Sequence, residues 1–263
     1  MISPYKSSWF QVTHPAPSAK IRLFCFPYAG GSASVFHQWP DKFSRDVEII
    51  ALQYPGRGNR FGERLISTCD GIVSVLMPHI TPLLNKPYAL FGHSNGGLVS
   101  FELARALQRA GHAGPVHHFI SGKSPVQLPR KKMVLHHLPD EAFLRELSDL
   151  GATPKEFIED PELMRIFMPI LRADFALSET YTYVEHGERL KTDATLLYGR
   201  EDEAYSEGDV ATWSELIDGH MDSVGYDAGH FFIHSHRQEV IRFVNQKLVS
   251  KMTEQEKSRL CYA

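Results

Sequence analysis

The chain has 263 residues and a formal net charge of −3, with a composition that is 43% hydrophobic and 22% charged. This length fits one large α/β domain, and this charge gives no long-range attraction for nucleic acid, so we expect no nucleic-acid partner. Three widely spaced cysteines, no signal peptide and no apolar run of roughly 20 residues predict a cytoplasmic chain without a disulfide framework or a membrane partner.

Short apolar runs alternate with helical patterns along the chain. The apolar runs predict buried strands over residues 21–26, 47–53, 88–91, 117–120, 194–198 and 223–226. Between and after them, apolar residues at helical spacing predict helices over 72–80, 98–107 and 240–248. This alternation predicts an α/β fold, with a mostly parallel central sheet flanked by helices, in a single domain spanning residues 1–263.

One stretch, residues 138–183, interrupts the alternation because it carries helical patterns and no strand signal. Asp140 is a candidate helix cap, and Asp160-Pro161 predicts another helix with proline in its first position. A helical insertion before the last strands is typical of a lid, so 138–183 is interpreted as one. The alternative is a set of additional core helices.

The segment Gly92-His93-Ser94-Asn95-Gly96 matches the pattern Gly-x-Ser-x-Gly between a predicted strand and a predicted helix. A serine on such a sharp turn exposes its hydroxyl, and glycines two residues to either side remove side chains that would clash. The N-terminus of the following helix favours a developing negative charge. Ser94 is therefore the candidate nucleophile.

A serine hydroxyl needs a base, and in folds with this turn the order along the chain is serine, acid, histidine. His230 follows the strand predicted over 223–226 and is the candidate base. His93 is interpreted as a packing residue beneath the turn. His234 and His236 are expected in the final helix, at the surface or packed against the protein.

The acid is expected after the strand predicted over 194–198, where the chain reads Gly-Arg-Glu-Asp-Glu. Asp202 is the candidate, because this turn approaches the histidine loop and a carboxylate there can fix the imidazole tautomer. Glu201 and Glu203 are the competitors and are expected to be exposed. The turn after the strand over 117–120 contains no carboxylate, which favours Asp202.

An oxyanion intermediate needs two backbone donors. One is expected to be the N–H of Asn95, directly after the candidate nucleophile. The other is expected from the loop Pro-Tyr-Ala-Gly-Gly-Ser over 27–32, with Ala29 as the donor. The alternative for this loop is a glycine turn without a catalytic role.

Two further sequence features bear on partners and metals. The cluster Arg130-Lys131-Lys132 is interpreted as a solvated loop, with a patch for an acidic partner as the alternative. No Cys-x-x-Cys or His-Glu-x-x-His motif is present, so no metal site is expected.

Five segments in this order resemble the type II thioesterases, stand-alone editing enzymes of non-ribosomal peptide and polyketide synthesis with an α/β-hydrolase fold. They are FPYAGGSASVF (26–36), YPGRGNRFGE (54–63), FGHSNGG with FELARAL behind it (91–107), LRADFALSETY (171–181) and AGHFF (228–232). Vertebrate medium-chain thioesterases of fatty-acid synthesis are similar, so the resemblance narrows the substrate to acyl thioesters and not to one pathway.

The resemblance implies the triad Ser94, Asp202 and His230, oxyanion donors at Ala29 and Asn95, and a flexible lid at 138–183. It implies hydrolysis of acyl groups from the phosphopantetheine arm of acyl or peptidyl carrier proteins. We expect a monomer without a cofactor of its own. The alternatives are a general carboxylesterase or lipase-like hydrolase, and a non-catalytic module that binds carrier proteins.

The chain departs from the family pattern at three positions, which bear on fine specificity and not on the triad. Asn95 stands where the family usually has an apolar residue, often methionine. Asp227-Ala228-Gly229 replaces a usual Gly-Gly before the histidine, and Gly58 replaces a usual glutamate.

Overall fold

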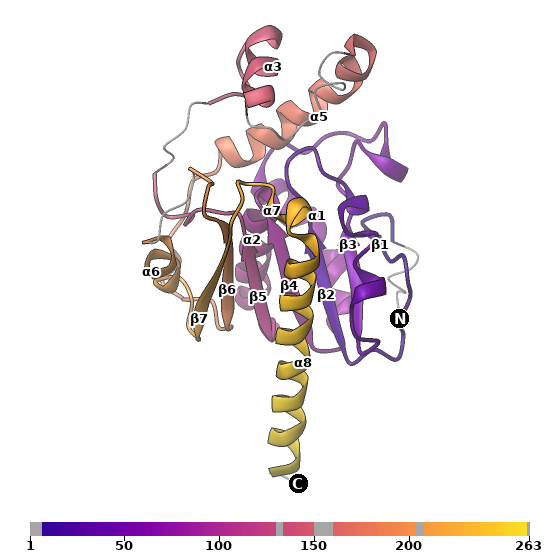
Figure 1. The fold of residues 1–263 in the computed structure, drawn as a ribbon, viewed down its shortest axis with the longest axis vertical. Coiled ribbons are helices and arrows are strands. Elements are labelled where there is room, and N and C mark those ends of the chain that lie inside the picture. The colour runs from indigo at the N-terminus through magenta and orange to yellow at the C-terminus, as the bar shows by residue number, and fades with distance from the viewer. Residues whose placement is uncertain (1–6, 130–133, 150–159, 204–207, 262–263) are drawn as a thin grey trace.

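The computed structural model describes residues 7–129, 134–149, 160–203 and 208–261 (Figure 1). The basic cluster Arg130-Lys131-Lys132 and part of the stretch 138–183 lie outside the described residues. Within the described part of the chain, no helix is long and apolar enough to cross a membrane.

A seven-stranded sheet with the order β1-β3-β2-β4-β5-β6-β7 forms the centre of the molecule. All neighbouring strands pair in parallel except β1, which is antiparallel to β3. The predicted mostly parallel sheet is therefore confirmed. The strands are β1 (Phe10–Gln11), β2 (Ile21–Phe26), β3 (Val47–Leu52), β4 (Tyr88–His93), β5 (His117–Ser121), β6 (Ala194–Gly199) and β7 (Met221–Tyr226).

The predicted strands agree with the observed ones apart from their ends. β4 runs two residues further than expected, to His93, and β7 begins two residues earlier, at Met221. β1 was not predicted, because two residues are too short to show an alternating pattern.

Helices cover both faces of the sheet. They are α1 (Cys69–Ile80), α2 (Asn95–Arg109), α3 (Asp140–Asp149), α5 (Pro161–Glu179), α6 (Asp209–Ser214), α7 (Phe232–Ser235) and α8 (Arg237–Cys261), with short 3-10 helices at Ala33–Phe36, Pro40–Lys42, Gly58–Arg60 and Thr81–Leu83. Figure 1 shows α3 and α5 at one end of the sheet, while α8 runs along one face and extends beyond the other end.

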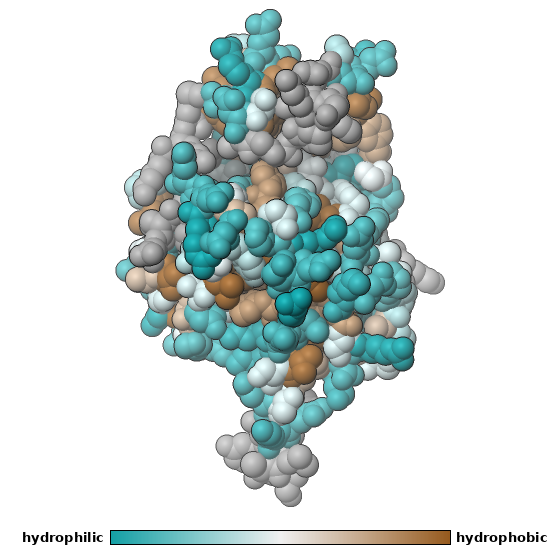
Figure 2. Space-filling model, in the orientation of Figure 1, coloured by the Kyte–Doolittle hydropathy of each residue, from teal (hydrophilic) through white to brown (hydrophobic). Residues whose placement is uncertain are grey.

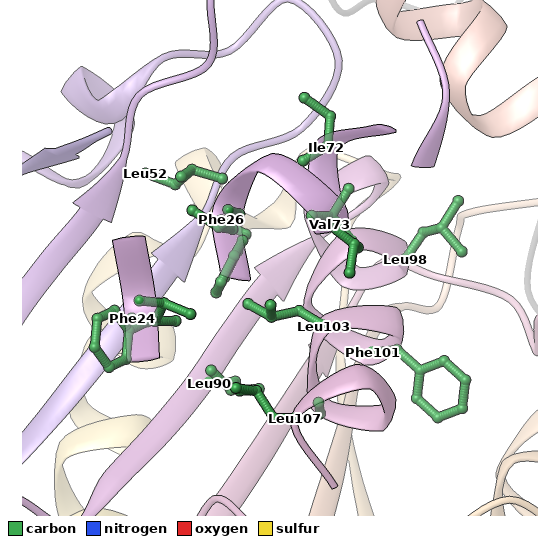
Figure 3. Packing of buried hydrophobic residues seen from close by; sticks show 14 of the residues in the cluster. Phe24, Phe26, Leu52, Ile72, Val73, Leu90, Leu98, Phe101, Leu103 and Leu107 are labelled. Atoms are coloured by element: carbon green, nitrogen blue, oxygen red, sulfur yellow. The ribbon is translucent and has the colours of Figure 1, made fainter. Parts of the chain in front are cut away.

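The two faces have separate hydrophobic clusters. On one face, α1 and α2 pack on the sheet, and Figure 3 shows Leu107 of α2 beside Leu90 of β4. On the other face, α8 packs through residues such as Val244 and Leu248. The outer surface on the side of α8 is mainly hydrophilic (Figure 2). Because each sheet face is covered, the strands carry almost continuous apolar runs.

The stretch 138–183 contributes α3 and α5, which share a hydrophobic cluster separate from the two sheet clusters. Its buried members include Phe143, Leu147, Met164 and Leu171. α5 begins as expected, because the Asp160 side chain accepts hydrogen bonds from the N–H groups of two residues in the first turn. Asp140, expected as a cap, is instead the first residue of α3 and accepts a hydrogen bond from Arg172 of α5 at 2.6 Å.

Acid is expected to destabilise the fold through two buried histidines of β5. Burial lowers the pKa of His117 to about 4 and that of His118 to about 3. Since an unfolded histidine titrates near 6.5, the unfolded chain binds more protons below that pH. Stability is therefore full above about pH 6.5 and decreases as the pH falls toward 4 and 3, by about 2 kcal/mol per histidine between pH 7 and 5.

The measurement is the urea midpoint of unfolding at pH 7 and pH 5. His118→Gln keeps a side chain able to hydrogen-bond Ser100 Oγ, which lies 2.9 Å from His118 Nε2, and is expected to reduce the difference between the two midpoints. The exposed His220, replaced by glutamine, is the control and is expected to leave that difference unchanged. Equal pH dependence in the wild type and His118→Gln would contradict the prediction.

Candidate active site

Four loops that follow parallel strands meet at the carboxyl edge of the sheet. Ala29 follows β2, Ser94 follows β4, Asp202 follows β6 and His230 follows β7. Ligand sites in α/β sheets form at this edge, because the loops there converge from several strands.

Ser94 occupies a strained turn between β4 and α2. Its backbone has φ 55° and ψ −116°, and it is the one non-glycine residue with positive φ in the described part of the chain. The Ser94 N–H donates to the carbonyl of Ser121 at the end of β5, at 2.8 Å. Strain of this kind persists only where the surroundings enforce it, and it is found at functional sites.

The two glycines of the motif allow this turn to pack closely. A Cβ on Gly96 would lie 2.0 Å from the carbonyl oxygen of Phe26, and one on Gly92 would lie 2.1 Å from the carbonyl oxygen of Gly96. Any residue with a Cβ atom would clash at these distances, so only glycine fits at both positions. The glycines therefore bring the start of α2 against the end of β2, beside the loop that carries Ala29.

The loop after β2 forms a tight turn over Tyr28–Gly31. The Gly31 N–H donates to the Tyr28 carbonyl at 2.9 Å, and Gly30 has φ +77°, as the third residue of a type II turn does. Because the peptide is trans, the Ala29 N–H points away from the Tyr28 carbonyl and out of the turn. Within the described residues, no backbone hydrogen bond uses the N–H groups of Ala29 or Asn95.

Asp202 and His230 form a hydrogen-bonded pair. His230 Nδ1 lies 2.6 Å from Asp202 Oδ2, with the carboxylate side chain 7% exposed and the imidazole 29% exposed. This contact leaves Nε2 as the ring nitrogen that can act toward a substrate. The competing acids Glu201 and Glu203 are exposed. A Cβ on Gly199 would lie 2.3 Å from the Ala228 carbonyl oxygen, so glycine allows the two loops to approach.

His93 packs behind His230. It is fully buried, its Nδ1 shares a hydrogen bond of 2.8 Å with Ser121 Oγ, and its ring centroid lies 5.3 Å from that of His230. Burial is the main cause that lowers the pKa of His93 well below its ordinary value. A neutral His93 adds no positive charge beside His230, which agrees with its interpretation as a packing residue.

The expectation that His234 and His236 lie in the final helix is wrong. His234 belongs to the short helix α7, and His236 lies between α7 and α8. The chain bends there, and no glycine or proline in the sequence marks the break. His234 Nε2 shares a hydrogen bond of 2.7 Å with the Tyr28 hydroxyl, which links the histidine loop to the loop of Ala29.

A buried ion pair beside the site joins two residues to which the sequence assigned no role. Arg57 Nη1 lies 2.5 Å from Asp174 Oδ2, and both side chains are buried. Arg57 and Asp174 lie in the segments YPGRG and LRADF, which are among those that resemble the type II thioesterases. The signal available in the sequence was Asp174, a charged side chain within the apolar helical pattern of α5.

Among the described residues, no group of three or more histidine, cysteine, aspartate or glutamate side chains is placed to bind a metal ion. The chemistry available to these residues is nucleophilic: a hydroxyl on a strained turn, an imidazole oriented by a carboxylate, and two backbone N–H donors.

Comparison with known proteins identifies a matching family. The model of the thioesterase domain matches residues 21–248. The gramicidin S biosynthesis protein GrsT of Aneurinibacillus migulanus is 38% identical over 242 residues, covering 92% of this chain and 94% of that protein.

Two solved structures are similar over most of their length. ClbQ from the colibactin NRPS/PKS pathway has a TM-score of 0.84 and 32% identity, covering 89% of this chain and 99% of that chain. The type II thioesterase BorB from the borrelidin biosynthetic cluster has a TM-score of 0.82 and 32% identity, covering 90% and 96%.

Proposed function

The chain belongs to the thioesterase domain family, and on that premise we propose that it releases acyl groups from the phosphopantetheine arm of carrier proteins through an acyl-serine intermediate. Its role is to clear misprimed or stalled units from non-ribosomal peptide or polyketide synthases. The observation that carries the proposal is the hydrogen bond between Asp202 and His230 at the same sheet edge as the strained Ser94. Support for the carrier-protein substrate comes from the similarity to BorB and ClbQ.

Each residue has a distinct role in the proposed reaction. His230 Nε2 takes the proton of Ser94 Oγ as the oxygen attacks the thioester carbonyl, and Asp202 holds the imidazole in the tautomer that allows this. The N–H groups of Ala29 and Asn95 stabilise the oxyanion. The C–S bond breaks, His230 returns the proton to the departing thiolate, and a water activated by His230 hydrolyses the acyl-serine.

The stretch 138–183 acts as a lid over the acyl group in this proposal. Support comes from the separate hydrophobic cluster of α3 and α5 and from their place at one end of the sheet (Figure 1). A lid of this kind excludes water from the reacting carbonyl. We also propose that the enzyme is a cytoplasmic monomer. It needs no resident cofactor in this proposal, because the phosphopantetheine belongs to the carrier-protein substrate.

A comparison of three substrates with the same acyl group tests the function. The kcat/KM for an acyl-phosphopantetheine carrier protein is expected to exceed that for the matching p-nitrophenyl oxyester, since the thioester is the proposed substrate. Free phosphopantetheine thioester separates recognition of the arm from recognition of the carrier protein. A preference for the oxyester would indicate a carboxylesterase, and no hydrolysis of any of the three would indicate a binding module.

A further inference from the structure

One residue of α5 contacts both loops that carry the proposed oxyanion donors. The Asp174 carboxylate accepts a hydrogen bond from the Gly30 N–H at 2.7 Å, directly after Ala29. The backbone carbonyl of Asp174 accepts a second from Asn95 Nδ2 at 2.6 Å. Asp174 therefore joins the turn after β2 to the start of α2.

Arg57 completes this contact from the loop after β3. Its guanidinium makes two hydrogen bonds to the Asp174 carboxylate, from Nη1 at 2.5 Å and from Nη2 at 2.8 Å. Nη1 also lies 3.1 Å from the Gly31 carbonyl oxygen, to which it donates. The turn over Tyr28–Gly31 is thus held through a carbonyl by Arg57 and through an N–H by Asp174.

α5 also packs directly on this turn. A Cβ on Gly30 would lie 2.8 Å from Leu171 Cδ2, and the positive φ of Gly30 disfavours any other residue. Leu171 precedes Asp174 by three residues, so both side chains lie on the same face of α5. This face approaches the turn closely enough for a direct hydrogen bond to Gly30.

Arg57 and Asp174 form a buried ion pair, in which each charge compensates the other. The side chains of Arg57 and Asp174 are 7% and 8% exposed. A buried carboxylate with several N–H donors and a two-pronged arginine has a strongly defined position. Removing either partner leaves the other charge buried without compensation, so the arrangement of the turn changes with it.

From these contacts we propose that Asp174 and Arg57 are positioning residues, which fix the N–H groups of Ala29 and Asn95 at the distance and angle that an oxyanion requires. This inference rests on the proposed function. Asn95 is one of the positions at which this chain departs from the family pattern given above, and its side chain adds a direct link from the second donor to α5. The helix of the proposed lid and the oxyanion site therefore form one hydrogen-bonded unit.

The test compares binding of the tetrahedral state with binding of the ground state. An acyl trifluoromethyl ketone thioether forms a hemiketal with Ser94, whose oxyanion occupies the donor site, whereas the matching thioether without the ketone binds without reaction. Asp174→Asn is expected to weaken the ketone by about 10- to 100-fold, somewhat less than complete loss of one donor. Binding of the plain thioether and the KM are expected to remain within about twofold, with the loss in kcat.

Glu102→Gln is the matched control. Glu102 of α2 pairs with Arg105 at 2.6 Å with the same side-chain exposures, 8% and 7%, and accepts a hydrogen bond from Tyr181. Among the described residues its side-chain hydrogen bonds go to Arg105 and Tyr181 and not to either donor loop, so the ratio of ketone to thioether affinity is expected to equal that of the wild type. Asn95→Ala, which keeps its backbone N–H and leaves the ion pair intact, is expected to shift the ratio in the same direction as Asp174→Asn by a smaller factor.

Three results would overturn the inference. The first is an unchanged ratio in both Asp174→Asn and Asn95→Ala, and the second is an equal shift in Glu102→Gln, which would make the effect a general consequence of lost stability. The third is a wild-type enzyme that forms no hemiketal on Ser94, as judged by intact mass or by ¹⁹F NMR. That third result appears before any variant is made and identifies a failure of the proposed function itself.

Discussion

Replacing Ser94 with alanine is expected to reduce hydrolysis of an acyl-carrier thioester by about a millionfold, the size of effect seen when a triad nucleophile is removed. No acyl-enzyme forms without the hydroxyl, and His230 has no proton to accept at that position. Stability is expected to stay unchanged, because the turn is held by the backbone N–H of Ser94 and not by its side chain. Single-turnover assays by mass spectrometry of the carrier protein measure the loss.

A second serine provides the control for this variant. Ser235 at the end of α7 is exposed and hydrogen-bonds the neighbouring His236, so Ser235→Ala is expected to hydrolyse the substrate at the wild-type rate. A fluorophosphonate probe is expected to label the wild type and Ser235→Ala but not Ser94→Ala. Substantial turnover or labelling in Ser94→Ala would place the nucleophile elsewhere.

Asp202→Asn is expected to lower kcat by about 10⁴-fold while the protein remains folded. The amide can occupy the same space, but it can donate to His230 Nδ1 and so favours the tautomer with the proton on Nε2. That tautomer cannot take the proton of Ser94. Asp202 Oδ2 and His230 Nδ1 are 2.6 Å apart, so an amide at position 202 lies within hydrogen-bond distance of this nitrogen.

Glu201→Gln and Glu203→Gln make the same chemical change at the two neighbouring positions. Both glutamates are exposed, so each variant is expected to retain nearly wild-type kcat. A strong loss in either of these variants, together with nearly full activity in Asp202→Asn, would transfer the role of the acid to that glutamate.

Most of the fold could be predicted from local patterns. Strands buried on both faces are continuous apolar runs, and this is why β2, β5 and β6 could be predicted at 21–26, 117–120 and 194–198, within one residue of their observed ends. The ends of strands are less visible, because the Gly-His end of β4 contains no typical strand residues. The break between α7 and α8 was also missed, since both sides have compatible helical composition.

The candidate site also has residues that local patterns predict and residues that they do not. Ser94 lies in a five-residue motif whose glycines are required locally, and Asp202 and His230 each follow a strand at a defined position in the chain order. The partners Tyr28–His234 and Arg57–Asp174 are separated by 206 and 117 residues. Such pairs have no local spacing that reveals them.

The amino-acid sequence by itself determined the alternation of strands and helices and the strained turn at Ser94, because each depends on neighbours within a few residues. The order of the strands along the chain then placed the candidate acid and base of the triad. Only the tertiary structure decided that Asp174 of α5 meets both Gly30 and Asn95, and that Asp202 rather than an adjacent glutamate meets His230. The reason is physical: these contacts depend on how distant segments pack against each other, and their burial, distance and direction exist only once the chain has folded.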